Sequence, residues 1–515
     1  MSASGNSAVR LTGVDTAASR GALPARLGWW RAAAVATRRH RLAVVLLAAG
    51  LVLRVLAQFA YRPALFLDAT RYLYNSYGND PVGYEGPLRA ILWAGGNFDA
   101  VVAVQHLLGL YMAALIYLVL LRRGASRWLA ALAVAPVLLD AYQLQNEQTI
   151  LPGTFFQALI VTGIAVLLWR PGPGWGRAAA GGLALGTSAI FAQVGEGLIV
   201  PAVIYLIACG GGWWRVAGRT AALAAAFALP ILSYCTVSYV VSGAFFLSHT
   251  GDTSLYGRTA SAADCATLRL PASERSLCPD RQQQLEGPDW LEYAPQSPVA
   301  PYYAHLPRAE VNSLVSDFNH RVLTQQPMRV LASYSRDVVK LYALVRVTDQ
   351  GDTQISRWQF QLRYPYHPPN ATLPIVLRVT RQFGGGPPRV WTPVASFLRG
   401  YQLHGGFTPG PLLLVFTLAS LAGPAALLRR RTDPRTRQLA LGCLLLSGSG
   451  VVLLLVSDVF EYSWRYQLPA LVTLVPGGAL GLGIILEAVR ARWRRPTPEP
   501  AAPDEQAPDE QATVP

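Results

Sequence analysis

The stretch Arg38–Ala60 reads RRHRLAVVLLAAGLVLRVLAQFA, a basic cluster followed by an almost unbroken apolar run. Residues 42–60 come close to the ~20 apolar residues that an α-helix needs to cross a bilayer. Arginines beside such a run mark its cytoplasmic end. The stretch therefore predicts a membrane-spanning helix that begins at the cytoplasmic side.

The composition of the whole chain agrees with this stretch. Of 515 residues, 52% are hydrophobic and only 14% are charged, whereas soluble domains carry about 25% charged residues. Lys340 is the only lysine, and the net charge is +15. The low charge content argues against an ordinary soluble enzyme, and the long apolar blocks exclude a disordered chain.

Further apolar runs indicate an α-helical polytopic membrane protein with about ten spans, in a range of nine to twelve. They lie at 42–60, 100–121, 128–146, 154–169, 178–193, 195–209, 220–242, 408–428, 438–457 and 466–487. Every second connecting loop is rich in arginine, which places both termini in the cytoplasm. The positive charge thus follows the topology, so it gives no support to nucleic-acid binding.

The same pattern divides the chain into parts. We expect a basic cytoplasmic tail (1–41), an N-terminal transmembrane module (42–242) with a first outside loop (61–99), an extracytoplasmic domain (243–407), C-terminal transmembrane helices (408–487) and a disordered cytoplasmic tail (488–515). A plasma-membrane location follows from this multi-pass organisation.

Within the extracytoplasmic domain, apolar spacing predicts two amphipathic helices, at 308–325 and 328–344, while residues 345–400 remain unassigned. Cys265 and Cys278 are the only cysteines of this domain and lie thirteen positions apart. A disulfide between them fits an oxidising exterior.

Candidate chemistry begins in the first outside loop, where Asp68-Ala-Thr-Arg71-Tyr72 follows the first span. Asp68 and Arg71 are three residues apart and share one side of a helical turn. A carboxylate can accept a proton from a hydroxyl, and a guanidinium can bind a phosphate. A plain surface ion pair is the alternative interpretation.

A second polar group follows the third span, at Asp140-Ala-Tyr-Gln-Leu-Gln-Asn-Glu147. Ionisable groups at membrane depth usually face a cavity or a partner. If the span stays helical, Asp140 and Glu147 lie two turns apart on one face. Arg54, inside the first span, is a cavity-lining residue that pairs with one of these carboxylates. The alternative interpretation is that these polar residues form the ordinary solvated end of a helix and have no role in chemistry.

A third group, Arg465-Tyr466-Gln-Leu-Pro469, enters the last span. An arginine at the outer mouth of a span can hold a lipid phosphate, although arginine and aromatic residues also serve there as interfacial anchors.

These motifs resemble those of the GT-C-fold glycosyltransferases that use polyprenyl-phosphate-linked sugars, in particular the protein-mannosyltransferase-like (family 39) and aminoarabinose-transferase-like branch, including actinobacterial members. The resemblance rests on Asp68–Tyr72, on Glu147 followed by aromatics, and on Arg465–Pro469. It implies that Asp68 and Glu147 are catalytic, with Asp68 as the base, that Arg71 and Arg465 bind the donor phosphate, and that Tyr72, Arg54, Asp140 and Tyr466 line the cavity.

One departure concerns the basic residue that the family often has before a Pro-Pro pair. Here the stretch reads Tyr84-Glu85-Gly86-Pro87-Leu88, so Arg89 or Arg465 would have to replace it. No cofactor is certain. A divalent metal ion, held by Asp140 or Glu147, is a further way to stabilise a leaving phosphate.

The resemblance implies transfer of a sugar from a polyprenyl-phosphate donor to an acceptor hydroxyl at the outer face, with inversion. The acceptor can be an envelope glycan, a lipid or a protein, and these residues do not identify which sugar is transferred. The alternatives are a transporter or flippase of lipid-linked or envelope substrates, a non-catalytic scaffold, and a ligase or phosphotransferase that uses the same carriers. No internal repeat of the kind found in transporters is present.

Overall fold

The computed structural model describes residues 37–62, 69–74, 83–248, 251–364, 372–429, 432–460 and 462–493. Within these ranges the chain is helical, apart from one isolated β-bridge between Tyr61 and Val390. The fold class expected from the apolar runs, an α-helical membrane protein, is confirmed.

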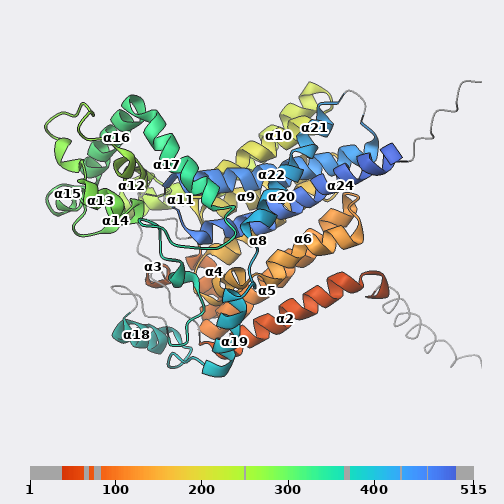
Figure 1. Ribbon diagram of the computed structural model, residues 1–515, viewed down its shortest axis with the longest axis horizontal. Coiled ribbons are helices and arrows are strands. Elements are labelled where there is room, and N and C mark those ends of the chain that lie inside the picture. Colours follow the sequence, from red (N-terminus) through yellow and green to blue (C-terminus); the bar gives the residue numbers. More distant parts are fainter. Residues whose placement is uncertain are drawn as a thin grey trace, which may run out of the picture.

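Long apolar helices form a bundle in which neighbours along the chain run in opposite directions (Figure 1). Its N-terminal part consists of α2 (Arg41–Ala60), α5 (Phe98–Arg122), α6 (Arg127–Leu139), α7 (Ala141–Gln148), α8 (Gly153–Leu168), α9 (Trp175–Ala189), η1 (Gln193–Leu198), α10 (Ile199–Cys209) and α11 (Trp213–Ser242). Its C-terminal part consists of α20 (Gly410–Ser420), α21 (Ala422–Leu427), α22 (Pro434–Phe460), η4 (Trp464–Gln467), α23 (Leu468–Val472) and α24 (Leu474–Trp493).

Each expected span coincides with a helix or a pair of helices in this bundle. Six described helices are long and apolar enough to cross a membrane, and the bent pair α6–α7 makes seven. The segments at 153–168 and 193–209 are apolar but shorter. The number of about ten spans therefore remains a prediction.

The arginine-rich loops meet at one end of the bundle, on the right of Figure 1. Arg123 donates to the carbonyl of Leu168, and Arg437 donates to the carbonyl of Ala208. Arg435 donates to the carbonyl of Gly124. The alternation of charge along the sequence thus becomes a segregation of charge in space, as the positive-inside rule requires.

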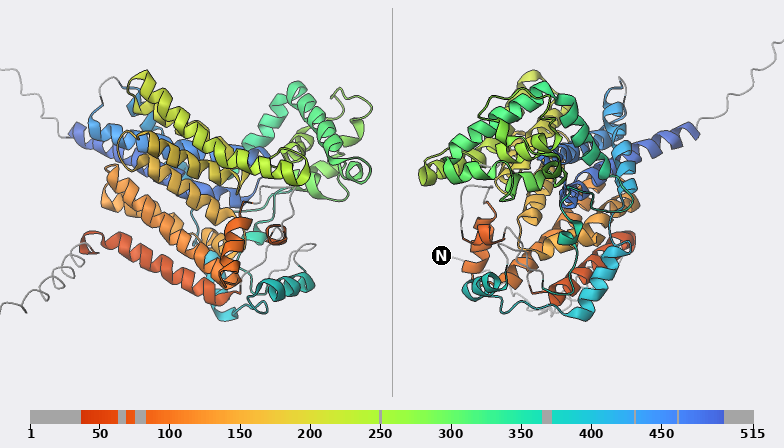
Figure 2. Two further views of the ribbon diagram at one scale, coloured as in Figure 1. Left: turned by 180° about the vertical axis from the view of Figure 1, so that it is seen from behind. Right: turned by 60° about the vertical axis from the view of Figure 1, so that its left-hand side comes forward.

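The opposite end carries the remaining helices, which we call the outer helices after their expected side, in two groups that Figure 2 also separates. The first contains α12 (Gly251–Ala262), η2 (Arg275–Leu277), α13 (Arg281–Leu285), α14 (Pro288–Tyr293), α15 (Ala300–His305), α16 (Arg308–Gln325) and α17 (Pro327–Lys340). The second contains α3 (Ala69–Leu73), α4 (Glu85–Trp93), η3 (Ile355–Trp358), α18 (Leu373–Phe383) and α19 (Thr392–Leu403).

The two helices expected from the apolar spacing at 308–325 and 328–344 are α16 and α17, so both are confirmed, the second ending earlier at Lys340. The apolar face of α16 is fully buried in a core that α12 and α14 share, with Val311, Val315, Phe318 and Val322. Cys265 and Cys278 form a disulfide beside this core, as expected.

The stretch 243–407 does not pack as one unit. α19 lies against α2 and α7 instead, where Ala395 and Leu398 join Ala57, Tyr61 and Leu144 in a separate apolar core. α18 adds Val376 and Val379 to the main core. Apolar contacts of α19 and of α18 therefore attach this group of outer helices to the bundle in two separate places.

Candidate active site

Asp68, the expected base, lies outside the described residues. Arg71 and Tyr72 lie on the short helix α3 that follows it. The ring of Tyr72 is buried and meets the ring of Tyr84 edge-on at 5.5 Å. The Tyr84 hydroxyl donates to Gln105 on α5 at 2.8 Å, and burial raises its pKa, which keeps the proton in place. This chain of contacts holds α3 against α5.

Glu147 lies in a fully buried charged centre where α2, α5 and α7 meet. Arg54 of α2 donates to its carboxylate at 2.7 Å, and Gln143 donates to the same oxygen at 3.2 Å. His106 of α5 contacts the other oxygen at 3.1 Å. Arg54 also donates to the carbonyls of Gly50, Leu138 and Val137. The expected pairing of Arg54 with a nearby carboxylate is confirmed.

Gly109 of α5 makes room for this centre. A Cβ atom at that position would lie 2.2 Å from Oε1 of Glu147 and 2.7 Å from Nη2 of Arg54. Any side chain would displace one of the two charges. A glycine inside an apolar span therefore has a specific packing reason here, namely an ion pair pressed against the helix backbone.

The third apolar run is not one straight helix, so the expectation that Asp140 and Glu147 share a helix face is wrong. The axis bends by 50° between α6 and α7. Asp140 has extended backbone angles at the break, and its side chain caps α7 by accepting from the N–H groups of Tyr142 and Gln143. Its second oxygen accepts from the N–H of Thr408 at 2.7 Å. Pro136, one turn earlier, weakens the helix before the bend.

Arg346 is a functional candidate that the sequence alone did not reveal. Its guanidinium is almost buried and lies over the rings of Tyr142, Phe407 and Trp464, at 4.2, 5.3 and 5.3 Å from their centroids. The Asp140 carboxylate is 3.8 Å away, beyond hydrogen-bond reach. Both terminal nitrogens of Arg346 lack a hydrogen-bond partner among the described residues.

The outer end of α22 holds three more side chains of this kind. Both carboxylate oxygens of Asp458, the hydroxyl of Tyr462 and the hydroxyl of Ser463 are buried without a hydrogen-bond partner among the described residues. Tyr462 meets Trp464 edge-on at 5.4 Å. Burial first, and the Asp458 carboxylate second, raise the pKa of Tyr462, so its hydroxyl remains a donor.

We call Arg346, Asp458, Tyr462 and Ser463 the outer polar cluster. Each buried polar atom without a partner costs about 1–3 kcal/mol of stability. Native proteins keep few such atoms, and those they keep are often completed by a ligand or by water. The set contains a cation, a carboxyl group and two hydroxyls beside aromatic rings.

Arg465 and Tyr466 lie next to this cluster on η4. The Arg465 guanidinium lies over the rings of Trp358 and Tyr466, at 4.7 and 5.3 Å. Trp464 of the same short helix donates to the carbonyl of Val347, and Gln467 donates to that of Leu341. These bonds bring the segment with Arg346 beside η4. Arg465 and Arg346 thus approach one another through the fold, although 119 positions separate them in the sequence.

Arg89, a possible substitute for the missing basic residue, pairs with Glu85 one helical turn before it and is more than half exposed. Burial raises the pKa of Glu85, and the neighbouring Arg89 only partly offsets that shift. Arg89 is therefore already engaged by a neighbouring carboxylate.

A divalent metal does not fit the residues in view. In the described ranges, no three His, Cys, Asp or Glu side chains come together as a metal site would require. Asp140 is engaged in capping α7, and Glu147 is bound to Arg54 and Gln143. We therefore derive no step through a metal ion.

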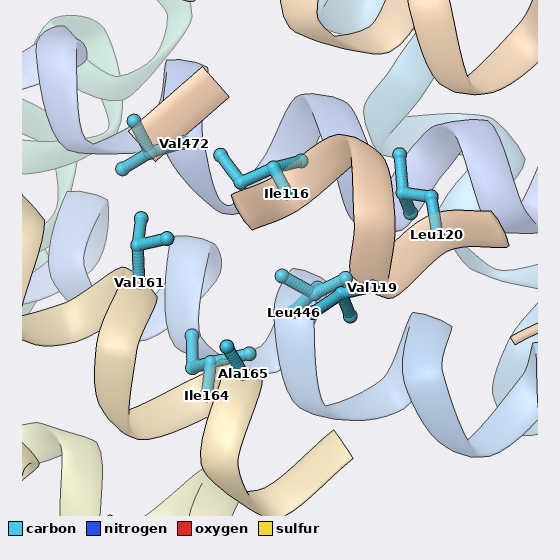
Figure 3. A pocket seen from close by; sticks show the side chains of 8 residues that line it. All are labelled: Ile116, Val119, Leu120, Val161, Ile164, Ala165, Leu446 and Val472. Atoms are coloured by element: carbon cyan, nitrogen blue, oxygen red, sulfur yellow. The ribbon is translucent and has the colours of Figure 1, made fainter. Parts of the chain in front are cut away.

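An apolar pocket lies deeper in the bundle, between α5, α8, α22 and α23 (Figure 3). Eight aliphatic side chains line it: Ile116, Val119, Leu120, Val161, Ile164, Ala165, Leu446 and Val472. This pocket therefore offers no polar group that could orient a phosphate or a sugar.

No protein-family model and no curated protein matches the chain. Among solved structures, it is similar to the protein O-mannosyltransferase Pmt1–Pmt2 complex of S. cerevisiae bound to the sugar donor, with 17% identity over 42% of this chain and 36% of that one, at a TM-score of 0.31. It is also similar to ArnT from Cupriavidus metallidurans bound to undecaprenyl phosphate, with 13% identity over 85% and 77% of the two chains, at a TM-score of 0.31.

A third similar structure is the archaeal oligosaccharyltransferase AglB from Archaeoglobus fulgidus, in complex with an inhibitory peptide and a dolichol-phosphate, with 12% identity over 88% of this chain and a TM-score of 0.40. This chain spans 51% of AglB. The first of these proteins is named as a mannosyltransferase and the third as an oligosaccharyltransferase. At such low identity, activity and substrate have to be argued from the residues of this chain.

Proposed function

We propose that this protein is an integral membrane glycosyltransferase that moves a sugar from a polyprenyl-phosphate donor to an acceptor hydroxyl at the outer face of the membrane. The observation that carries the proposal is the outer polar cluster. It lies where α22 ends and the outer helices begin, which is the depth at which the head of a lipid-linked sugar leaves the bilayer. There a bound sugar phosphate would satisfy the unpartnered groups of Arg346 and Asp458.

In this proposal Asp68 is the base. It takes the proton of the acceptor hydroxyl, whose oxygen attacks the anomeric carbon from the side opposite the phosphate. The bond between that carbon and the phosphate oxygen breaks, and the lipid phosphate leaves with the electron pair. The configuration at the sugar is therefore inverted.

Cationic side chains stabilise the departing phosphate. We assign this role to Arg71, which follows Asp68 by three residues, and to Arg465 at the mouth of the last span. Preorganised charges of this kind typically contribute about 10²- to 10³-fold to the rate. Tyr72 and Tyr466 line the cavity beside them.

Glu147 and Arg54 act in this proposal as positioning residues, and not as the catalytic and cavity-lining residues that the resemblance implied. Their charges already satisfy each other inside the bundle, so neither is available for proton transfer or for a phosphate. They fix α2 and α7 relative to α5, and with them the first outside loop. Asp140 has an equivalent role at the start of α7.

We place the enzyme in the plasma membrane with both termini in the cytoplasm, because the arginine-rich ends of the helices meet on one side. The acceptor is an envelope glycan, lipid or protein. A flippase for the same lipid-linked substrates is the competing function, since it would also need a site for the phosphosugar head.

The deciding experiment uses the full chain in nanodiscs with radiolabelled polyprenyl-phosphate mannose and polyprenyl-phosphate arabinofuranose, and with envelope extracts as acceptors. We expect covalent transfer by the natural protein, and none by Asp68→Ala. Asp264→Asn, which alters a partly exposed carboxylate of the outer helices, is the matched control and should retain activity.

Full transfer by Asp68→Ala would refute the mechanism. Movement of labelled donor across vesicles without a covalent product would favour the flippase. Comparing envelope glycans of a deletion strain with those of its parent by mass spectrometry would identify the sugar and the acceptor together.

A further inference from the structure

The helix α17 exposes three large apolar side chains, although the residue that it buries is charged. Its apolar residues Met328, Leu331 and Val339 are exposed, by 70%, 49% and 69%. Asp337 is the one residue of α17 that is buried, with 7% of its surface exposed. A helix surrounded by water hides its apolar face, so this arrangement indicates a different medium on the outer side.

The buried side of α17 is held by charge. Arg258 of α12 binds Asp337 at 2.6 Å and donates to the hydroxyl of Ser333 at 3.0 Å. The same guanidinium donates to the carbonyls of Asp458 and Val459 at 2.9 and 3.2 Å, at the end of α22. These contacts fix the orientation of α17, because rotating the helix about its axis would expose Asp337 and break its pairing with Arg258.

One hydrogen bond relates the position of α17 to the length of α22. The hydroxyl of Tyr334, in the middle of the helix, donates to the carbonyl of Leu455 at 3.1 Å. The apolar span of α22 extends to Val459, four residues further. At 1.5 Å per residue, the Tyr334 hydroxyl therefore contacts α22 about 6 Å inside the end of that apolar segment. Interfacial helices bury their apolar face by about 5–10 Å.

The exposed apolar surface continues on both sides of α17. Leu344, Val345 and Val347, which follow the helix, are each more than half exposed. Val451 and Leu455, on the neighbouring α22, are also exposed within a membrane span. Figure 1 shows α17 running obliquely across the outer end of the bundle rather than along the spans.

We infer that the apolar face of α17, formed by Met328, Leu331 and Val339, is inserted among the lipids of the outer leaflet. Continuity with the lipid-exposed side of α22 identifies the acyl chains as the occupant. The exposed arginines 329 and 336 flank the face and suit the phosphate groups of the lipid heads. This inference does not depend on the proposed enzymatic activity.

The test places single nitroxide labels on the full chain in nanodiscs of phosphatidylethanolamine and phosphatidylglycerol. The background replaces the free cysteines 209, 235 and 443 by alanine and keeps the disulfide. Leu331→Cys and Val339→Cys carry the test labels. Leu455→Cys, 40% exposed on α22, is the lipid reference, and Leu323→Cys, 39% exposed on α16, is the water reference.

We expect labels at 331 and 339 to collide more often with oxygen than with a water-soluble nickel chelate, as at 455, and the label at 323 to show the opposite order. Nickel-dominated relaxation at 331 and 339 would place the face in water and overturn the inference. Low access to both reagents, together with dipolar broadening in discs that hold two copies, would assign the face to a second copy of the chain and would also overturn it.

Discussion

The buried pair Arg54–Glu147 offers the sharpest test of how this membrane bundle is held together. The two side chains are 2.7 Å apart and are 2% and 0% exposed. Glu147→Gln keeps the shape of the side chain but removes its charge. Arg54 then remains a buried cation without a counter-charge, and His106 loses its carboxylate contact.

Breaking a buried pair in this way typically costs about 3–5 kcal/mol, because the remaining charge is left without compensation. Replacing both partners by apolar residues of similar size, in Arg54→Met with Glu147→Leu, should cost clearly less than either single change. Gly109→Ala forces the same pair apart without removing a charge, so we expect a loss of about 1–3 kcal/mol from overpacking.

The measurement is reversible unfolding in mixed micelles titrated with sodium dodecyl sulfate, followed by circular dichroism. Two controls are matched to the variants. Glu487→Gln removes one partner of the exposed pair with Arg435 and should cost less than about 1 kcal/mol. Gly86→Ala lies in a helix where a Cβ atom would meet no atom within 4 Å, and should change stability by less than about 1 kcal/mol.

A cost for Glu147→Gln as small as that of Glu487→Gln would refute the reasoning. So would a double variant that loses the sum of the two single costs. If Glu147→Gln were as stable as the natural protein but inactive in sugar transfer, Glu147 would be catalytic, as its position in the sequence motif implied.

Three further predictions concern the outer helices. Reducing the Cys265–Cys278 disulfide, or replacing both cysteines by serine, should destabilise them by about 3 kcal/mol, measured by limited proteolysis, and unchanged cleavage would contradict this. Arg258→Ala should speed hydrogen exchange in α12 and α17, whereas Arg329→Ala, which removes a long and exposed ion pair, should not. Glu85→Gln should stabilise the protein at neutral pH. The raised pKa of Glu85 means that the folded state holds this proton to a higher pH than the unfolded state, so the stability of the natural protein falls as pH rises above about 4.5. In thermal unfolding, the extra stability of Glu85→Gln should therefore shrink below that pH. Extra stability that does not change with pH would contradict the prediction.

Much of the architecture was predictable because its causes are local. Apolar runs and arginine-rich loops predicted where the long helices lie and which of their ends meet. The apolar spacing of α16 and the two outside cysteines likewise depended only on residues near one another in the sequence. The arginine in the first span also indicated a partner, because an isolated charge at membrane depth is too costly to keep.

The identity of the partners was decided only by tertiary structure. Glu147 is 93 positions from Arg54. The three aromatic rings around Arg346 come from three separate parts of the chain. His106 carried a signal that reasoning from motifs missed, since it is an ionisable residue inside an apolar span. Asp140 caps α7 with one carboxylate oxygen and accepts with the other from the N–H of Thr408, which no local pattern connects to it.

The sequence by itself thus determined that this is a membrane protein, which segments form the apolar helices, and which residues are candidates for chemistry. Tertiary structure alone decided which charges are satisfied and which remain without a partner. Periodicity and hydropathy act within one helix, whereas burial and pairing arise between helices that are distant in the chain. For that reason Glu147, prominent in the sequence, became part of the framework, while Arg346 and Asp458 emerged as buried groups without a hydrogen-bond partner among the described residues.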